Sequence, residues 1–349
     1  MEQVSKRMYK RMASFALTAI LLAGATATTV QATDWNVIAG AESPDRGSHA
    51  LAFLTNELWV HTGDSIHWTF ATHEKHTLTF LKPGQTRPAA FGSVFGVEIG
   101  CPGTTPDGSG FDGSSCVHSG VLVLDDAVPA ASVPSYSVRF PSTGNFKFVC
   151  LFHSGMTGQV HVLDVSQSLP HNQDFYDRQA HREQALLLAA ASGLQGEGTP
   201  SALDGAQNSV AAGSGQITTT TGAGSVTISL MRFVRDTILV HVGDTVEWVN
   251  LNPSVNHTVT FGTEPADPRT VSTNVQTTSD GARQAAIGSP ADSVNSGYLS
   301  PTPQDRANLA QAAPNVARFR VTFTSPGTFN YICAIHDQLG MIGTVIVNP

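Results

Sequence analysis

The feature that most constrains the fold of this chain is an internal repeat. The segment LWVHTGDSIHW at residues 58–68 aligns without a gap with ILVHVGDTVEW at residues 238–248. HTLTF at residues 76–80 then corresponds to HTVTF at residues 257–261. Matching segments that recur in the same order indicate two copies of one structural unit.

The pattern within each copy is that of a β-domain. Short alternating strands are separated by turn residues, and only 13% of the 349 residues are charged, which suits a turn-rich β protein. The shared Gly-Asp pairs at residues 63–64 and 243–244 predict hairpin turns. We therefore expect an all-β fold with two tandem Greek-key β-sandwich domains.

The repeat also suggests the domain boundaries. We place the first domain at residues 33–166 and the second at residues 225–349, since each then ends in a short apolar strand. Residues 167–224 lie between the two copies and have no counterpart in the repeat. This connecting segment is expected to join the domains without belonging to either.

The connecting segment has two parts of different composition. Residues 172–192 lack Gly and Pro and are rich in Ala, Leu, Gln and Arg, which predicts a helix with Asn172 as its N-cap. We expect this helix to pack over one of the sandwiches. Residues 193–224 are rich in Gly, Ser, Thr and Ala, which is typical of a flexible linker.

The N-terminus has the pattern of a secretory signal peptide, which we place at residues 1–32. A basic segment at residues 6–11 precedes an apolar stretch at about residues 13–25, and Val30-Gln31-Ala32 provides small residues for cleavage. The alternative is an uncleaved membrane anchor, for which the apolar stretch is short. We expect a periplasmic or secreted protein with no stable membrane insertion after cleavage.

Charge narrows the choice of partners. The chain has 19 Lys and Arg against 27 Asp and Glu, a net charge of −8, and no basic run follows the first dozen residues. A nucleic-acid-binding protein normally presents a basic face, so this class is set aside. Nothing in the sequence indicates an oligomeric state.

Two loops carry residues suited to a transition metal. Cys-x2-His-x2-Met occupies residues 150–156, and Cys-x2-His-x4-Met occupies residues 333–341. Each copy also has an upstream histidine, His76 or His257, that starts its His-Thr-x-Thr-Phe segment. Two imidazoles and one thiolate with a weak axial thioether form the blue-copper arrangement, which accepts both Cu(I) and Cu(II).

These motifs and the repeated strands around them resemble the cupredoxin family, the fold of plastocyanin, amicyanin and azurin. The first loop has amicyanin-like spacing and the second has plastocyanin-like spacing. The resemblance implies two type 1 (blue) copper ions per chain and an electron-transfer function with redox partner proteins. It also implies the ligands, which are His76, Cys150, His153 and Met156 for one copper and His257, Cys333, His336 and Met341 for the other.

The sequence departs from the small members of this family. The upstream histidine and the cysteine are 74 residues apart in the first copy and 76 in the second, which indicates an inserted loop region in each. Ser154 follows His153, whereas Asp337 follows His336. A carboxylate beside one ligand is expected to favour Cu(II) there, so we expect the two sites to differ in potential.

The remaining cysteines have a different context. Cys101 and Cys116 flank a Gly-rich loop inside the first insertion. In an oxidising compartment we expect them to form a disulfide. The alternative is a metal site formed by these two cysteines and His118.

Two other functions remain as alternatives to an electron carrier. A two-domain copper oxidoreductase, of the nitrite reductase or laccase kind, needs a second copper held by imidazoles and wired through a histidine beside the blue-site cysteine. The neighbours of Cys150 and Cys333 are all aliphatic, and the chain has no His-x-His pair, so we do not expect an enzyme. A copper storage or delivery protein would favour a Met- or His-rich tract, and none is found.

Overall fold

The computed structural model describes residues 31–85, 104–126, 133–196, 208–220, 224–300 and 316–349. The predicted signal peptide therefore lies almost wholly outside the described residues. No helix among the described residues is long and apolar enough to cross a membrane.

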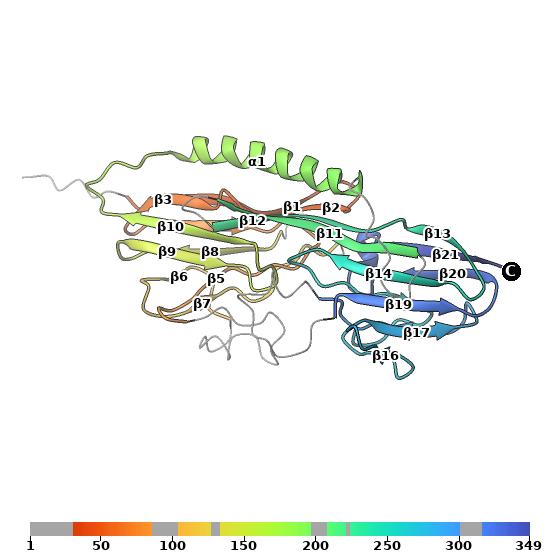
Figure 1. Ribbon diagram of the computed structural model, residues 1–349. Helices are drawn as coiled ribbons and strands as arrows, with labels where there is room; N and C mark the ends of the chain where they lie inside the picture. The colour runs from red at the N-terminus through yellow and green to blue at the C-terminus, as the bar shows by residue number, and fades with distance from the viewer. Residues whose placement is uncertain (1–30, 86–103, 127–132, 197–207, 221–223, 301–315) are drawn as a thin grey trace, which may run out of the picture. The chain divides into compact units, whose positions relative to one another are not determined.

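Strands are the main secondary structure of the described residues, and the largest assembly of strands is an 11-stranded sheet (Figure 1). The strand order is β16-β17-β19-β14-β11-β12-β2-β1-β4-β8-β6. The strands from the first copy of the repeat are β1 (Asp34–Glu42), β2 (Ser48–Leu54), β4 (Ser65–Thr69), β6 (Ser109–Gly110) and β8 (Ser135–Arg139). The others are β11 (Asn208–Thr220), β12 (Gly224–Val234), β14 (Thr245–Leu251), β16 (Gln276–Thr277), β17 (Arg283–Ile287) and β19 (Arg318–Phe323).

Two five-stranded sheets complete the sandwiches, one for each copy. The first has the order β3-β10-β9-β5-β7, and the second has the order β13-β21-β20-β15-β18. The strands of the first sheet are β3 (Glu57–His61), β5 (Thr79–Phe80), β7 (Val117–His118), β9 (Gly144–Val149) and β10 (Thr157–Leu163). The strands of the second are β13 (Thr237–His241), β15 (Thr260–Phe261), β18 (Val294–Asn295), β20 (Gly327–Ile332) and β21 (Ile342–Asn348).

Each sandwich encloses its own aromatic core. Trp68, on β4, and Trp248, on β14, occupy equivalent positions, and both are fully buried. Trp68 packs edge-on against Phe148, with ring centroids 5.5 Å apart, and Trp248 packs in the same way against Tyr331 at 5.1 Å. The predicted all-β fold with two repeated sandwiches is confirmed.

The prediction of hairpins at the Gly-Asp turns is wrong. β3 pairs with β10, whereas β4 pairs with β1 and β8, so the turn between them carries the chain from one sheet of the sandwich to the other. Asp64 fixes this turn because its carboxylate accepts from the backbone N–H of His61 at 2.9 Å. The turn chemistry is the same in a hairpin and in a sheet-to-sheet connection, so the sequence pattern does not separate them.

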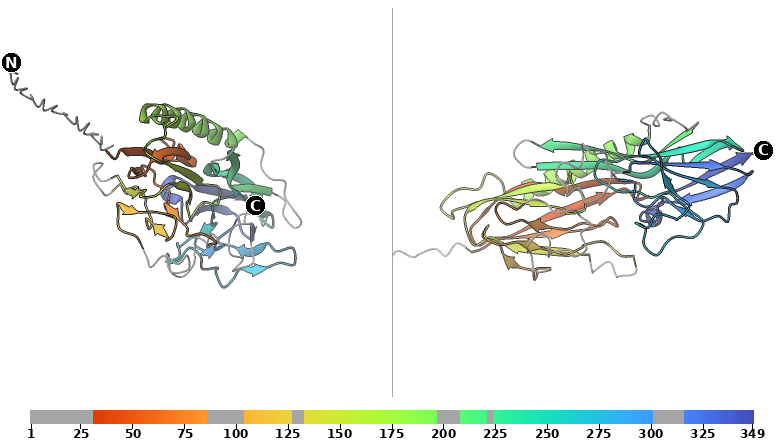
Figure 2. Two further views of the ribbon diagram at one scale, coloured as in Figure 1. Left: turned by 90° about the vertical axis from the view of Figure 1, so that its left-hand side faces the viewer. Right: turned by 60° about the horizontal axis from the view of Figure 1, so that its bottom comes forward.

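The predicted helix is confirmed as α1 (Gln173–Gly193), followed by the short 3-10 helix η2 (Leu194–Gly196). Asn172 is its N-cap, and the Asn172 side chain accepts from the backbone N–H of Phe175 at 3.0 Å. The helix lies along one face of the large sheet (Figures 1 and 2). Its apolar residues pack against strands of both copies, among them Leu54 of β2 and Leu230 of β12.

The prediction that residues 193–224 form a flexible linker is wrong for residues 208–220. These residues form β11, which pairs in parallel with β14 and antiparallel with β12. Their Gly and Ala content reflects close packing, because a Cβ on Gly215 would lie 2.9 Å from the Oδ1 atom of Asn252. The domain boundaries at residues 166 and 225 stay predictions.

The large sheet is continuous because equivalent strands of the two copies pair with each other. Phe53 on β2 and Phe233 on β12 hold equivalent positions, since each lies opposite the alanine that precedes a bulge in its neighbouring strand. Counted from these residues, His49 is equivalent to Ser229, and these two lie directly opposite one another where β2 pairs antiparallel with β12. The two copies are thus related by a local twofold axis through this pair.

Candidate metal centres

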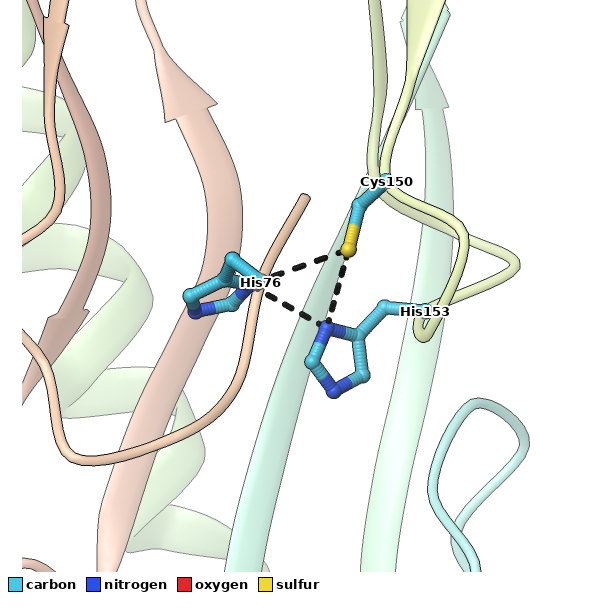
Figure 3. A group of neighbouring side chains, drawn as sticks. All are labelled: His76, Cys150 and His153. Atoms are coloured by element: carbon cyan, nitrogen blue, oxygen red, sulfur yellow. Dashed lines mark hydrogen bonds between the residues drawn. The ribbon is translucent and has the colours of Figure 1, made fainter. Parts of the chain in front are cut away.

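The first site gathers His76, Cys150 and His153 from two separate parts of the chain (Figure 3). His76 precedes β5, and the other two lie on the loop after β9. The Cys150 Sγ atom lies 3.9 Å from the His76 Nδ1 atom and 3.5 Å from the His153 Nδ1 atom. The two Nδ1 atoms lie 3.2 Å apart, so three donor atoms converge.

The second site repeats this geometry with His257, Cys333 and His336. The Cys333 Sγ atom lies 3.9 Å from the His257 Nδ1 atom and 3.5 Å from the His336 Nδ1 atom. The two Nδ1 atoms lie 3.1 Å apart. The corresponding distances of the two sites therefore agree within 0.1 Å.

The spacing of the donor atoms fits one metal ion at each site. A first-row metal such as Zn²⁺ binds imidazole nitrogen at about 2.0 Å and thiolate sulfur at about 2.3 Å, so a trigonal set leaves its two nitrogens roughly 3.5 Å apart and nitrogen and sulfur roughly 3.7 Å apart. The separations of 3.2 Å, 3.5 Å and 3.9 Å in the first site are close to these values. The donor set of two imidazoles and one thiolate, with methionine on the same loop, matches a blue-copper site. Two His-Cys-His groups, one in each copy of the repeat, thus fit two copper ions.

Threonine holds the upstream segment against each cysteine loop. In the first site the backbone N–H of Thr77 donates to the Cys150 Sγ atom at 3.4 Å, and the Thr77 hydroxyl accepts from the N–H of Leu151 at 2.8 Å. Thr258 makes the same two contacts with Cys333 and Ala334, at 3.3 Å and 2.7 Å. The residue after each upstream histidine therefore fixes the register between the two segments.

The predicted axial ligands Met156 and Met341 close the loops. Met156 is fully buried, and its carbonyl accepts from the N–H of Cys150 at 2.9 Å. Met341 is also fully buried, and its carbonyl accepts from the N–H of Cys333 at 3.0 Å. The second loop is longer and includes the 3-10 helix η4 (Asp337–Leu339). Each methionine belongs to the same apolar cluster as its cysteine, and axial ligation stays a prediction.

A glycine in a β-bulge lies against each upstream histidine. Gly40 on β1 and Gly213 on β11 both have a positive φ, of 74° and 76°. A Cβ on Gly40 would lie 2.8 Å from the His76 Nε2 atom, and one on Gly213 would lie 2.2 Å from the His257 Nε2 atom. These Nε2 atoms have no hydrogen-bond partner among the described residues, so packing holds the two rings.

The electrostatics of both sites favour a thiolate. Burial acts to raise the pKa of the Cys150 thiol, but the neighbouring imidazoles of His153 and His76 outweigh it and hold that pKa well below its usual range. Burial likewise acts to raise the pKa of the Cys333 thiol, but His336 outweighs it, so that pKa is also lowered. The thiolate is the form of cysteine that binds metal ions.

Glu74 is a site residue that the sequence analysis missed. Its Oε1 atom lies 3.2 Å from the His153 Nε2 atom, and its Oε2 atom lies 3.4 Å from the Nε2 atom of His336 in the second site. Burial acts to raise the pKa of Glu74, but His336 and His153 hold it well below its usual range. The signal was available in the repeat, where Glu74 precedes His76 by two residues and the equivalent residue is Val255.

Both sites border one small cavity of about 90 Å³. Its lining includes equivalent residues of the two copies, since His153 corresponds to His336 and Phe152 to Ile335. His153 is 1% exposed and His336 is 4% exposed, so the outer edges of both rings are covered. The polar group that meets both edges is the carboxylate of Glu74.

The other histidines and cysteines lie outside the two donor sets. His73 lines the same cavity and contacts Glu42 at 2.6 Å and Asp126 at 2.9 Å. His118 is buried on β7, and its Nδ1 atom lies 2.8 Å from the Thr79 hydroxyl. The predicted disulfide involves Cys101, which lies outside the described residues, so both that pairing and the alternative metal site stay untested.

Comparison with known proteins agrees with this geometry. Residues 220–348 match the family of copper binding proteins, plastocyanin/azurin family. No curated protein matches the chain. Among solved structures, the chain is similar to the Cu(I) form of an amicyanin mutant, with 20% identity, a TM-score of 0.20, and coverage of 34% of this chain and 74% of amicyanin.

A mutant plastocyanin of fern is similar over 40% of this chain and 99% of its own length, with 21% identity and a TM-score of 0.22. Structural similarity at this level carries no argument. The copper sites are therefore assigned from the family match and the two donor sets. The second copy of the repeat thus matches the plastocyanin/azurin family of copper-binding proteins.

Proposed function

We propose that this protein is an exported copper-binding electron-transfer protein with two type 1 copper sites. In this proposal His76, Cys150, His153 and Met156 hold one copper, and His257, Cys333, His336 and Met341 hold the other. The observation that carries it is the trigonal donor set, repeated in both copies with distances that agree within 0.1 Å.

A bound copper ion supplies one-electron chemistry, because it is stable as Cu(I) and as Cu(II). The contribution of the chain is a donor set that changes little between these states. Thr77 and Thr258 tie the upstream segments to the cysteine loops, and Gly40 and Gly213 allow the bulged strands to lie against the histidine rings. Such packing supports an electron carrier, since little reorganisation is then needed when an electron arrives.

Metal analysis with visible and EPR spectra of the mature protein tests this function. We expect two copper ions per chain, a strong blue absorption band, reversible one-electron reduction at each site and no type 2 signal. Cys150→Ser and Cys333→Ser should each remove one blue site and leave the other. A variant that retains both blue sites would refute the ligand assignment.

The same spectra separate the alternative functions. A stoichiometric type 2 signal would favour a two-domain copper oxidoreductase of the nitrite reductase or laccase kind. Rapid loss of Cu(I) to a chelator would favour a storage or delivery protein. Export to the periplasm or medium, and cleavage after Ala32, are checked by N-terminal sequencing of the protein from cell fractions.

A further inference from the structure

We propose that Glu74 is a positioning residue shared by the two copper sites. Its carboxylate accepts the Nε2–H of His153 from its own domain and that of His336 from the other, so metal binding in the second site depends on a side chain of the first domain. This inference rests on the proposed function and names a residue outside both ligand sets.

The geometry of the two imidazole rings supports this role. In each ring the Nδ1 atom faces the cysteine sulfur and the other histidine, which leaves Nε2 as the outer nitrogen. The two carboxylate oxygens of Glu74 lie 3.2 Å and 3.4 Å from these two Nε2 atoms. A ring whose Nε2–H is held by a carboxylate keeps the tautomer and orientation in which Nδ1 can bind a metal.

The burial of this group explains why one carboxylate serves both rings. The Glu74 side chain is 10% exposed, and the side chains of His153 and His336 are 2% and 4% exposed. The equivalent residue of the second copy, Val255, lines the same cavity. A second carboxylate at that position would bring two negative charges into one small buried space, which is costly. The apolar residue at one position therefore fits the shared use of the acid at the other.

The experiment isolates the second site from the first. In a Cys150→Ser background only the second site remains, and all four of its predicted ligands come from the second domain. Glu74→Gln is introduced into this protein, and Cu(II) affinity is measured by chelator competition and the reduction potential by titration. The glutamine keeps one acceptor oxygen but places an NH₂ group at the other position, where it cannot accept an N–H. Glu74→Val, which copies Val255, removes both acceptors.

Glu42→Gln is the matched control. Glu42 is a partly buried carboxylate nearby, and it accepts from both the backbone N–H and the ring of His73 instead of from a predicted ligand. The Glu42→Gln change removes one negative charge, as Glu74→Gln does, but alters no contact to either donor set. Thermal unfolding of each metal-free variant shows whether the protein is folded before copper is added.

We expect Glu74→Val to weaken Cu(II) binding at the second site by about 10–100-fold, the usual effect of losing a hydrogen bond to a metal ligand. If Cu(I) binding is unchanged, each tenfold loss raises the potential by about 59 mV. The Cu(II) affinity of Glu74→Gln should fall between those of Glu74→Val and the parent, and the affinity of Glu42→Gln should match that of the parent. A second site that is unchanged in Glu74→Val, or changed equally by Glu42→Gln, overturns the inference. Absence of any blue band in the Cys150→Ser parent instead overturns the proposed function.

Discussion

Replacing Gly213 by alanine tests whether close packing positions His257. The Cβ atom would lie 2.2 Å from the Nε2 atom of His257 and within 2.9 Å of two ring carbons, and the histidine is fully buried. Relief of this contact requires the ring or β11 to move, which typically costs about 1–3 kcal/mol. The positive φ of 76° adds about 1–2 kcal/mol for any residue with a Cβ atom. The total destabilisation should therefore reach about 2–5 kcal/mol.

Gly243→Ala is the control, because it separates backbone strain from the contact with the ring. Gly243 has a φ of 93°, and a Cβ there would meet no atom within 4 Å. In chemical denaturation of the metal-free proteins, both variants should lose free energy of unfolding to backbone strain. Only Gly213→Ala should show the additional loss from the contact with the ring. In the Cys150→Ser background, Gly213→Ala should also weaken or shift the remaining blue band. Equal destabilisation by the two variants, with an unchanged blue band, would refute the argument that packing holds this ring.

Two further predictions concern stability. Glu247 is fully buried and accepts from Arg320 at 2.7 Å, and Asp280 accepts from the same guanidinium at 2.7 Å. Glu247→Ala therefore leaves the guanidinium with one carboxylate partner and should cost about 1–3 kcal/mol in urea unfolding; an unchanged free energy of unfolding would contradict this. Burial raises the pKa of Tyr136 and of Tyr176 to about 12, whereas tyrosine in an unfolded chain ionises near 10. The folded state therefore keeps these protons to higher pH, and stability should be lost as the pH rises from about 10 to about 12. Tyr176→Phe should lose less free energy of unfolding over this pH range than the parent. An equal loss in the variant and the parent would contradict the prediction.

The sequence predicted those features that depend on local spacing. Cysteine and histidine three residues apart lie on one loop, so their convergence at Nδ1 and Sγ needs little information from the rest of the chain. The N-cap at Asn172 is likewise a local interaction, with the backbone N–H three residues later. The upstream histidines were found because the repeat marked the same His-Thr segment twice.

Features that depend on distant contacts were not predicted. Residues 208–220 have the small and polar composition of a linker, yet Gly213 and Gly215 are small because a ring and a backbone carbonyl approach them closely. The contact between Glu74 and His336 joins residues 262 positions apart, in two copies of the repeat whose strands β2 and β12 pair with each other. Neither composition nor spacing carries information about that pairing.

The local twofold axis places both proposed copper sites beside one shared group. It brings the outer edges of His153 and His336 to one cavity, where a single carboxylate contacts both. Because this carboxylate is shared, its charge acts in the same direction on both proposed copper sites. A difference between their potentials must therefore arise from what the sites do not share. Two such features are the additional residues between His336 and Met341 and the carboxylate of Asp337, which directly follows a predicted ligand only in the second site. We accordingly expect Asp337→Ser, which copies Ser154, to bring the two potentials closer together.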